Sequence, residues 1–403
     1  MRTARRLAAA LTLALAVGPI GLSATPGRSA ARLAPCGPTV TDPLVEPPWA
    51  LTRLRPELAW PLSTGAGVTV AVIDSGVSPD HPTLTGKVAA GTDFLLRDGK
   101  GDCDENGHGT LIAGIIAGRE AVSGGYRFYG VAPNATIVPV RVLRDQRRST
   151  EGDLSDRIAE AIRWAVDVGH AEVLNLSLTT PSTPQLEAAV RYALDQRVVV
   201  VAAAGNQSES GSDQRGYPAA YPGVLAVAGV NNQDEHVDSS VQGDYIDVAA
   251  PGVRIAGPSP SGGGYLFSAE GGTSFATAYV SGVAALIRAY DPALPADQVA
   301  RRITETADHP PELWNPRVGY GVVNPARAVG SLRAAPVASA AAQPATDRLR
   351  PPAPPADPQR WLRSAAAWVA LAGVSVASLV LVAVPVVRMG RRRGWRTGRR
   401  TRA

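Results

Sequence analysis

Residues 70–76 read Val-Ala-Val-Ile-Asp-Ser-Gly, a run of small and β-branched apolar side chains that ends in a carboxylate beside a turn. A continuous apolar run of this kind is typical of a strand buried on both faces, as the strands of parallel sheets are. A polar residue directly after such a strand lies at the carboxyl edge of the sheet, where open α/β folds gather their chemistry. The stretch therefore predicts a parallel sheet of an α/β fold and marks Asp74 as a candidate functional residue.

The same alternation of elements continues from residue 66 to residue 333. Short apolar runs predict strands over 68–73, 136–142, 172–178, 198–204 and 224–230. Helical periodicity predicts helices over 108–117, 153–168, 184–196, 273–290 and 295–306, and Asp153 is suited to be an N-cap. Strands that alternate with helices favour an α/β fold, a parallel sheet with helices on both faces.

Three further polar residues stand at the ends of predicted elements. His108 begins an apolar helix, Ser274 begins a long helix after two glycines, and Asn206 follows a buried strand. Hydrolysis of an acyl bond needs a nucleophilic oxygen, an imidazole to take its proton, a carboxylate to hold the imidazole and a donor for the oxyanion. Each residue alone is more often a cap or turn residue, but with Asp74 they supply all four groups.

Residues 66–330 resemble subtilisin-type serine proteases, because the stretches 73–76, 108–110 and 272–274 match that family's Asp, His and Ser motifs. The resemblance implies an imidazole-orienting carboxylate, a general base and acid, a nucleophile and an oxyanion donor, carried by Asp74, His108, Ser274 and Asn206. It also implies a strand that pairs with the substrate backbone and one wall of the pocket for the residue before the scissile bond, formed by Ser177, Leu178, Thr179, Ala203, Ala204 and Gly205. Thr179 stands where relatives often have Gly, and Thr277-Ala278 where many have Pro, which affects the expected pocket shape and helix entry.

Both ends of the chain carry targeting signals. Residues 1–6 are basic and 7–20 are apolar but too short to span a bilayer, so 1–30 is predicted to be a cleaved signal peptide, with a retained anchor as the alternative. Residues 365–387 contain no charge and are followed by an arginine-rich tail, 388–403. They predict one C-terminal transmembrane helix, rather than a buried core helix, with the tail cytoplasmic and the body extracytoplasmic.

The formal charge of +5 comes from these two ends. Residues 1–25 and 388–403 hold eleven of the 40 Lys and Arg residues and no acidic residue, so the rest of the chain has 29 basic against 35 acidic residues. A body of net negative charge argues against a nucleic-acid partner.

The layout of the whole chain resembles the mycosins, the membrane-anchored subtilisin-like proteases of type VII secretion systems. It consists of the signal peptide, a Pro-rich N-terminal extension over 31–65, the protease domain over 66–333, a Pro/Ala-rich tether over 334–360, and the single span. The resemblance implies a single-pass protein of the cell membrane whose partners are a protein substrate and the type VII secretion membrane complex.

The two cysteines suggest one disulfide, because an even count in a secreted chain is usually paired. A bridge between Cys36 and Cys103 would clamp the extension beside the catalytic cleft, and two unpaired buried thiols are the alternative. A metal site is disfavoured, since two cysteines without a nearby His do not fill a tetrahedral shell. A solvated acidic loop, rather than a calcium site, is expected at Asp98, Asp102, Asp104 and Glu105, and no cofactor is expected.

These sequence features are compatible with three functions. The leading hypothesis is an anchored serine endopeptidase that cuts a protein outside the cytoplasmic membrane. The alternative is mainly a structural subunit that stabilises a secretion complex, with proteolysis secondary. A degradative quality-control protease fits the catalytic residues equally well but does not explain a clamped extension.

Overall fold

The computed structural model describes residues 36–144, 153–207, 215–331, 384–385 and 387–392. The chain divides into two units, 1–332 and 333–403. In the second unit, residues 384–385 and 387–392 are helical. Within the described residues no helix is long and apolar enough to cross a bilayer. The predicted signal peptide, the tether and all but the last few residues of the predicted span 365–387 lie outside the described residues.

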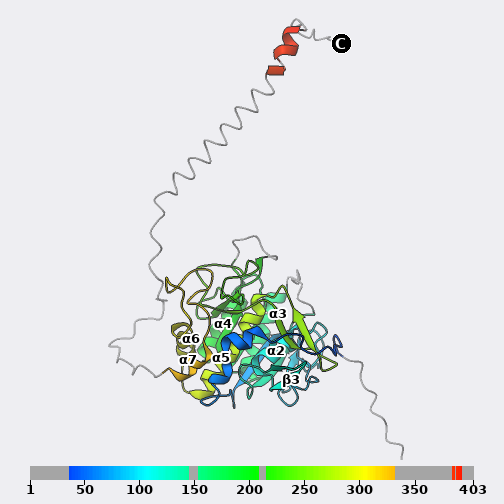
Figure 1. Cartoon of the computed structure of the whole chain (residues 1–403), viewed down its shortest axis with the longest axis vertical. Helices are drawn as coiled ribbons and strands as arrows, with labels where there is room; N and C mark the ends of the chain where they lie inside the picture. The colour runs from blue at the N-terminus through cyan, green and yellow to red at the C-terminus, as the bar shows by residue number, and fades with distance from the viewer. Residues whose placement is uncertain (1–35, 145–152, 208–214, 332–383, 386, 393–403) are drawn as a thin grey trace, which may run out of the picture. The chain divides into compact units, whose positions relative to one another are not determined.

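A seven-stranded parallel sheet organises the first unit (Figure 1). Its strands, in chain order, are β1 (Thr69–Asp74), β2 (Thr92–Asp93), β5 (Thr136–Arg141), β6 (Val173–Leu176), β7 (Val199–Ala203), β8 (Leu225–Val230) and β9 (Val248–Pro251). In space the order is β2-β5-β1-β6-β7-β8-β9, and every neighbouring pair is parallel. The five predicted strands are all present, so Asp74 and the ends of β6 and β7 share one edge of the sheet.

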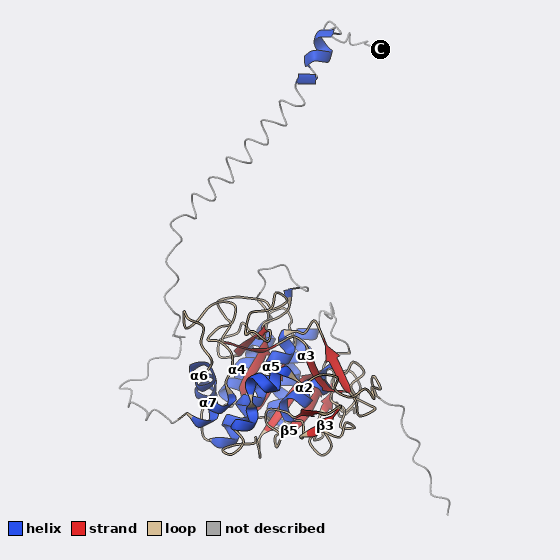
Figure 2. Cartoon of the chain, in the orientation of Figure 1, coloured by secondary structure: helices blue, strands red, loops and turns tan. Residues whose placement is uncertain are grey.

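Helices pack in pairs against this sheet (Figure 2). The long helices are α2 (His108–Ala117), α3 (Leu154–Asp167), α4 (Pro184–Asp195), α5 (Thr273–Tyr290) and α6 (Ala296–Glu305). Helix α2 packs against α5, α3 packs against α4, and each of these helices contacts the sheet. Strands β6, β7 and β8 are buried along their whole length, which confirms a parallel sheet covered on both faces.

Helix bounds agree with the predictions to within one residue, but the side chain of one predicted N-cap residue makes no capping hydrogen bond. Asp153 precedes α3, yet its carboxylate accepts no amide hydrogen bond from the helix. It forms an ion pair with Arg157, one turn further along, at 2.7 Å. Asp153 is therefore the N-cap residue, as predicted, but its side chain makes no capping bond, because a charged partner at i+4 competes for the carboxylate.

The elements that the sequence did not predict are all short. They are α1 (Trp49–Leu54), the 3-10 helix η1 (Pro56–Leu58), β2, the hairpin β3 (Ala121–Ser123) and β4 (Tyr126–Phe128), β9, the hairpin β10 (Ile255–Pro258) and β11 (Tyr265–Ser268), and α7 (Pro325–Gly330). Segments of two to six residues are too short for a hydrophobic period to be recognised.

The N-terminal extension is an integral part of this unit. The Val40 amide donates to the Ser261 carbonyl at 3.0 Å, and the Trp49 indole donates to the Val253 carbonyl at 2.9 Å. Helix α1 buries Ala50, Leu51 and Leu54 in the common core. The extension therefore shares the hydrophobic core of the domain instead of forming a separate lobe.

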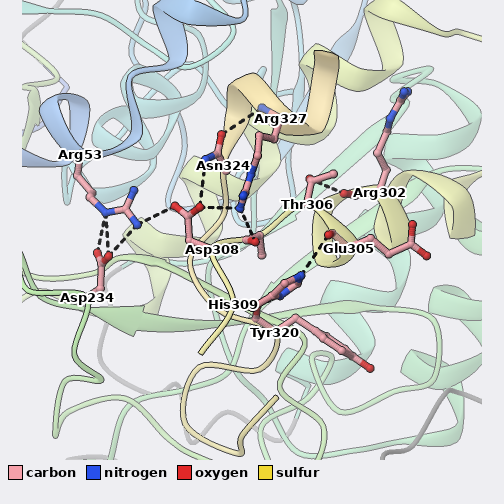
Figure 3. A network of polar contacts seen from close by, with 11 residues as sticks. Arg53, Asp234, Arg302, Glu305, Thr306, Asp308, His309, Tyr320, Asn324 and Arg327 are labelled. Carbon is pink, nitrogen blue, oxygen red and sulfur yellow. Dashed lines mark hydrogen bonds and ion pairs between the residues drawn. The ribbon is translucent and has the colours of Figure 1, made fainter. Parts of the chain in front are cut away.

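An ion-pair network also holds the extension, as Figure 3 shows. Arg53 Nη2 in α1 lies 2.7 Å from Asp234 Oδ2 and 2.9 Å from Asp308 Oδ2. The other oxygen of Asp308 accepts from Arg327 at 2.6 Å and from the Asn324 amide at 3.2 Å. The network thus joins the extension to the start of α7, at the far end of the domain's sequence.

Candidate active site

Asp74 and His108 form a buried pair. The carboxylate ends β1, the imidazole begins α2, and Asp74 Oδ1 lies 2.7 Å from His108 Nδ1. Asp74 Oδ1 also accepts from the Ser75 amide at 2.7 Å, and the two side chains are 0% and 4% exposed. The contact directs the Nδ1 proton at the carboxylate, which leaves Nε2 as the nitrogen that can accept a proton. Among the described residues, His108 Nε2 has no hydrogen-bond partner.

The surroundings of the imidazole raise the pKa of His108 above its ordinary value. Burial is the largest single effect and lowers this pKa. The charge of Asp74, its hydrogen bond to Nδ1 and the charge of Asp104 together outweigh burial. The site therefore favours the imidazolium form that arises when His108 takes a proton.

Ser274 lies in the first turn of α5, next to Phe275. The rings of His108 and Phe275 have centroids 5.7 Å apart, which places the imidazole beside the start of this helix. Ser274 Oγ donates to the carbonyl oxygen of Ser177 at 3.1 Å. The structure thus brings Asp74, His108 and Ser274 to one region, with the Ser274 hydroxyl bonded to Ser177.

Asn206 is fixed by the residue before Ser274. Its Oδ1 accepts from the Thr273 amide at 3.1 Å and from the Thr273 hydroxyl at 3.3 Å. This orientation keeps the Nδ2 group beside Gly272, where an added Cβ would lie 3.3 Å from Nδ2. Asn206 therefore presents an amide donor next to the start of α5, as an oxyanion donor requires.

The predicted substrate strand and pocket wall lie side by side. Ser177, Leu178 and Thr179 directly follow β6, and Ala204 and Gly205 directly follow Ala203, the last residue of the neighbouring β7. Leu178, Ala203 and Ala204 are buried, and the Ala204 carbonyl accepts from the Tyr245 hydroxyl at 3.0 Å. The Thr179 methyl would lie 3.3 Å from a Cβ at Gly205 and 3.1 Å from one at Gly216. Thr179 is thus packed closely against two glycines, at which a larger residue would contact its methyl group.

A buried chain of polar side chains lies beneath Ser274, and no pattern in the sequence predicted it. Ser281 Oγ donates to Asn175 Oδ1 at 2.9 Å, and Asn175 Nδ2 donates to Ser177 Oγ at 2.9 Å. Ser177 Oγ in turn donates to the Ser274 carbonyl at 2.9 Å. The one available signal was Asn175, a polar residue inside an apolar strand, because such a residue needs buried partners.

The structure joins Cys36 and Cys103 in a disulfide, with Cα atoms 5.3 Å apart. The bridge links the start of the described extension to the segment five residues before His108. The cysteines pair as predicted, and the alternative of two free thiols does not occur here.

The prediction of a solvated acidic loop was wrong for one residue. Asp98, Asp102 and Glu105 are exposed, as expected, but Asp104 is 0% exposed. Its carboxylate accepts hydrogen bonds from Ser75, Thr110 and nearby amides. These partners replace the water that an acidic residue otherwise needs.

Comparisons with known proteins identify the family of the chain. The Subtilase family matches residues 65–321. Mycosin-4 of Mycobacterium tuberculosis (strain ATCC 25618 / H37Rv) is 37% identical over 384 residues, covering 84% of this chain and 81% of that protein. Mycosin-3 of the same strain is 38% identical over 371 residues, which cover 78% of each protein.

A solved structure matches as well. It is described as a serine protease, MycP1, an essential component of the type VII (ESX-1) secretion system, and it aligns with a TM-score of 0.65 and 34% identity over 74% of this chain and 93% of that one. Since the family match spans more than half of the sequence and the mycosin matches extend over most of both proteins, the chain belongs to the subtilase family of serine peptidases and, within it, to the mycosins.

Proposed function

We propose that this peptidase is an endopeptidase that hydrolyses a protein substrate outside the cytoplasmic membrane with Asp74, His108 and Ser274 as its catalytic triad. The observation that carries the proposal is the 2.7 Å bond from His108 Nδ1 to Asp74, which leaves Nε2 available beside the start of α5. His108 Nε2 takes the Ser274 hydroxyl proton as Oγ attacks the scissile carbonyl carbon. Asp74 stabilises the imidazolium that forms, and Asn206 Nδ2 donates to the oxyanion.

The same groups carry out the remaining steps of the reaction. The imidazolium gives its proton to the leaving amine as the peptide bond breaks, and the acyl group stays on Ser274. His108 then takes a proton from a water molecule as that water attacks the ester, and gives the proton to Ser274 Oγ as the ester bond breaks and the acid leaves. The Ser274 hydroxyl begins this cycle by exchanging its bond to Ser177 for one to His108 Nε2, a rotation of one side chain.

The substrate backbone pairs with residues 177–179 in this proposal, and the side chain before the scissile bond enters the pocket beside residues 203–205. Supporting this, the two segments are adjacent and end on the same sheet edge as Asp74. The tight packing of Thr179 against Gly205 and Gly216 favours a small side chain in that pocket.

We also propose that residues 365–387 anchor the protein in the cell membrane after removal of the signal peptide, and that it works with a type VII secretion membrane complex. The support is the uncharged run in the sequence and the likeness to mycosins, one of which is described as an essential component of such a system. That description also favours a second role, as a structural subunit of the complex.

A test of the catalytic proposal uses the full chain in mild detergent. Labelling by a fluorophosphonate probe and hydrolysis of a fluorogenic peptide library should both require Ser274. Asn206→Ala should keep the labelling site but lower turnover by about 10²–10³, since one oxyanion donor is lost. Hydrolysis that survives Ser274→Ala would overturn the proposed chemistry.

A further inference from the structure

Asp104 is a buried carboxylate with five hydrogen bonds, four residues before His108. Its Oδ1 accepts from the Ser75 hydroxyl at 2.9 Å, from the Asn106 amide at 3.2 Å and from the Gly107 amide at 2.8 Å. Its Oδ2 accepts from the Thr110 amide at 2.8 Å and from the Thr110 hydroxyl at 2.7 Å. A fully buried charge with this many donors is held in one position.

The start of α2 depends on this carboxylate. The N-cap residue is Gly107, at φ 93°, and it has no side chain to accept from the first amides of the helix. Residues outside the helix accept instead: the Gly109 amide donates to Ser75 Oγ at 3.1 Å, and the Thr110 amide donates to Asp104. The His108 amide donates to Asn106 Oδ1 at 3.2 Å, so the backbone of this turn is held by Asp104, Ser75 and Asn106 rather than by its own cap.

Asp104 and Ser75 are also connected to Asp74 by hydrogen bonds. Ser75 Oγ donates to Asp104 Oδ1, and the Ser75 amide donates to Asp74 Oδ1 at 2.7 Å. Hydrogen bonds thus form a closed ring from Asp74 through Ser75 and Asp104 to the first turn of α2, and back from His108 to Asp74. A shift of Asp104 would move both partners of the 2.7 Å contact.

Asp104 also contributes charge. The positive end of the α2 dipole disfavours a protonated imidazole at its first residue. Two carboxylates oppose that effect, Asp74 from β1 and Asp104 from the loop before α2. Asp104 is therefore suited to stabilise the imidazolium without touching it.

We propose that Asp104 is a positioning residue for catalysis, which holds the His108 imidazole against Asp74 and favours its protonated form in the transition state. The proposal rests on the function proposed above, in which His108 is the general base. The extension supports the arrangement from outside: Cys103, bonded to Cys36, directly precedes Asp104, and Gly37, at φ 105°, packs so closely against the Asp104 carbonyl that no Cβ fits.

Three variants separate the effect of the Asp104 charge, the effect of its hydrogen bonds and the effect of losing an acidic residue elsewhere in this loop. Asp104→Asn keeps the shape of the side chain but removes the charge and one set of acceptor lone pairs. Thr110→Val keeps the charge of Asp104 and removes one hydroxyl, which donates to Asp104 and accepts from the Ser78 amide. Asp102→Asn makes the same chemical change as the first variant at an exposed position two residues away.

The experiment measures kcat, KM and their pH dependence from about pH 5 to 9 on a fluorogenic peptide, with the full chain in detergent. Asp104→Asn should lower kcat by about 10²-fold with KM nearly unchanged, because a misplaced base costs turnover more than binding. Its acidic limb should move to lower pH, since removal of a negative charge lowers the pKa of His108. Thr110→Val should lower kcat less and leave the limb in place, and Asp102→Asn should match the unmodified protein.

An Asp104→Asn protein that matches Asp102→Asn in both kcat and the acidic limb would overturn the proposal. Circular dichroism and thermal unfolding show whether each variant is folded. If Asp104→Asn does not fold, Thr110→Val decides, and unchanged kcat in that variant counts against the positioning role. Hydrolysis that persists in Ser274→Ala is a different outcome, because it contradicts the proposed triad and not the role of Asp104 alone.

Discussion

Ser177 and Ser274 exchange hydrogen bonds: Ser274 Oγ donates to the Ser177 carbonyl at 3.1 Å, and Ser177 Oγ donates to the Ser274 carbonyl at 2.9 Å. The second bond continues through Asn175 to Ser281, inside α5. The backbone of Ser274 is therefore fixed next to the end of β6. Its hydroxyl donates to a carbonyl oxygen that it can leave for another acceptor. In the proposed mechanism, this arrangement keeps the nucleophile beside the strand that pairs with the substrate.

Loss of any triad member should abolish peptide hydrolysis without unfolding the domain. We expect Ser274→Ala, His108→Ala and Asp74→Asn each to remove measurable turnover, and the double variants to be no worse, since the three groups act as one unit. Turnover of the fluorogenic peptide checks this, with circular dichroism as the folding control. Ser281→Ala should lower turnover without abolishing it, because it removes a buried hydroxyl that supports Ser274 through Asn175 and Ser177 but takes no part in the reaction.

Activity should fall on acidification, and the fall should begin above the ordinary imidazole range. His108 must be neutral to take the Ser274 proton, so activity is lost as the pH decreases through its pKa. Because the two carboxylates raise that pKa despite burial, the midpoint should lie above about 6.5. Burial lowers the pKa of His81 and of His236, so neither accounts for such a limb. A kcat/KM profile that stays flat from about pH 5 to 8 would contradict the role of His108.

The parts of the fold that have a regular apolar pattern could be predicted from the sequence. The strand before Asp74 and the helix after His108 are continuous apolar runs, so their type and position could be predicted, and Asp74, His108 and Ser274 could be matched to known motifs. Their meeting at one sheet edge follows from the parallel order of the strands.

The rest depends on contacts between residues far apart in the chain. Asp104 lies among other acidic residues, and although four of its five hydrogen bonds are local, the fifth comes from Ser75, 29 residues away. Arg53 looks like any surface arginine until Asp234 and Asp308 are brought beside it, 181 and 255 residues away. The contacts of Asp104 with Ser75 and of Arg53 with its two carboxylates cannot be predicted from neighbouring residues in the sequence.

The Cys36–Cys103 bridge should be present in the mature protein and should support the active site. Peptide mapping without reduction should find the linked pair. The double variant Cys36→Ser/Cys103→Ser should be less stable by about 2–4 kcal/mol, since the bridge spans 67 residues and restricts the unfolded chain. It should also lower kcat, because Cys103 directly precedes Asp104. Two thiols that alkylate freely in native membranes would contradict the bridge.

Arg53 should stabilise the domain through its two ion pairs. Arg53→Ala should lower the free energy of unfolding by about 1–2 kcal/mol, because the change breaks two pairs and leaves partly buried carboxylates unmatched. Arg127→Ala, which breaks a 2.7 Å pair with Glu120 between more exposed side chains, should cost clearly less, because solvent screens this pair. Denaturant unfolding of both variants tests the difference. Equal losses would mean that the network of Figure 3 adds nothing beyond a surface pair.

The two proposed roles should separate in cells. A peptidase that only meets a soluble substrate gains little from an anchor, whereas a subunit of a membrane complex gains local concentration from a short tether and a fixed membrane plane. We therefore expect that deleting the gene stops type VII-like secretion, while Ser274→Ala leaves secretion running and one substrate uncut. Replacing residues 365–387 with an unrelated membrane span then tests whether the proposed helix docks to the complex or only anchors the chain. If the Ser274→Ala strain fails to secrete as completely as the deletion strain, proteolysis alone must account for the function, since the folded domain without its nucleophile would then support nothing.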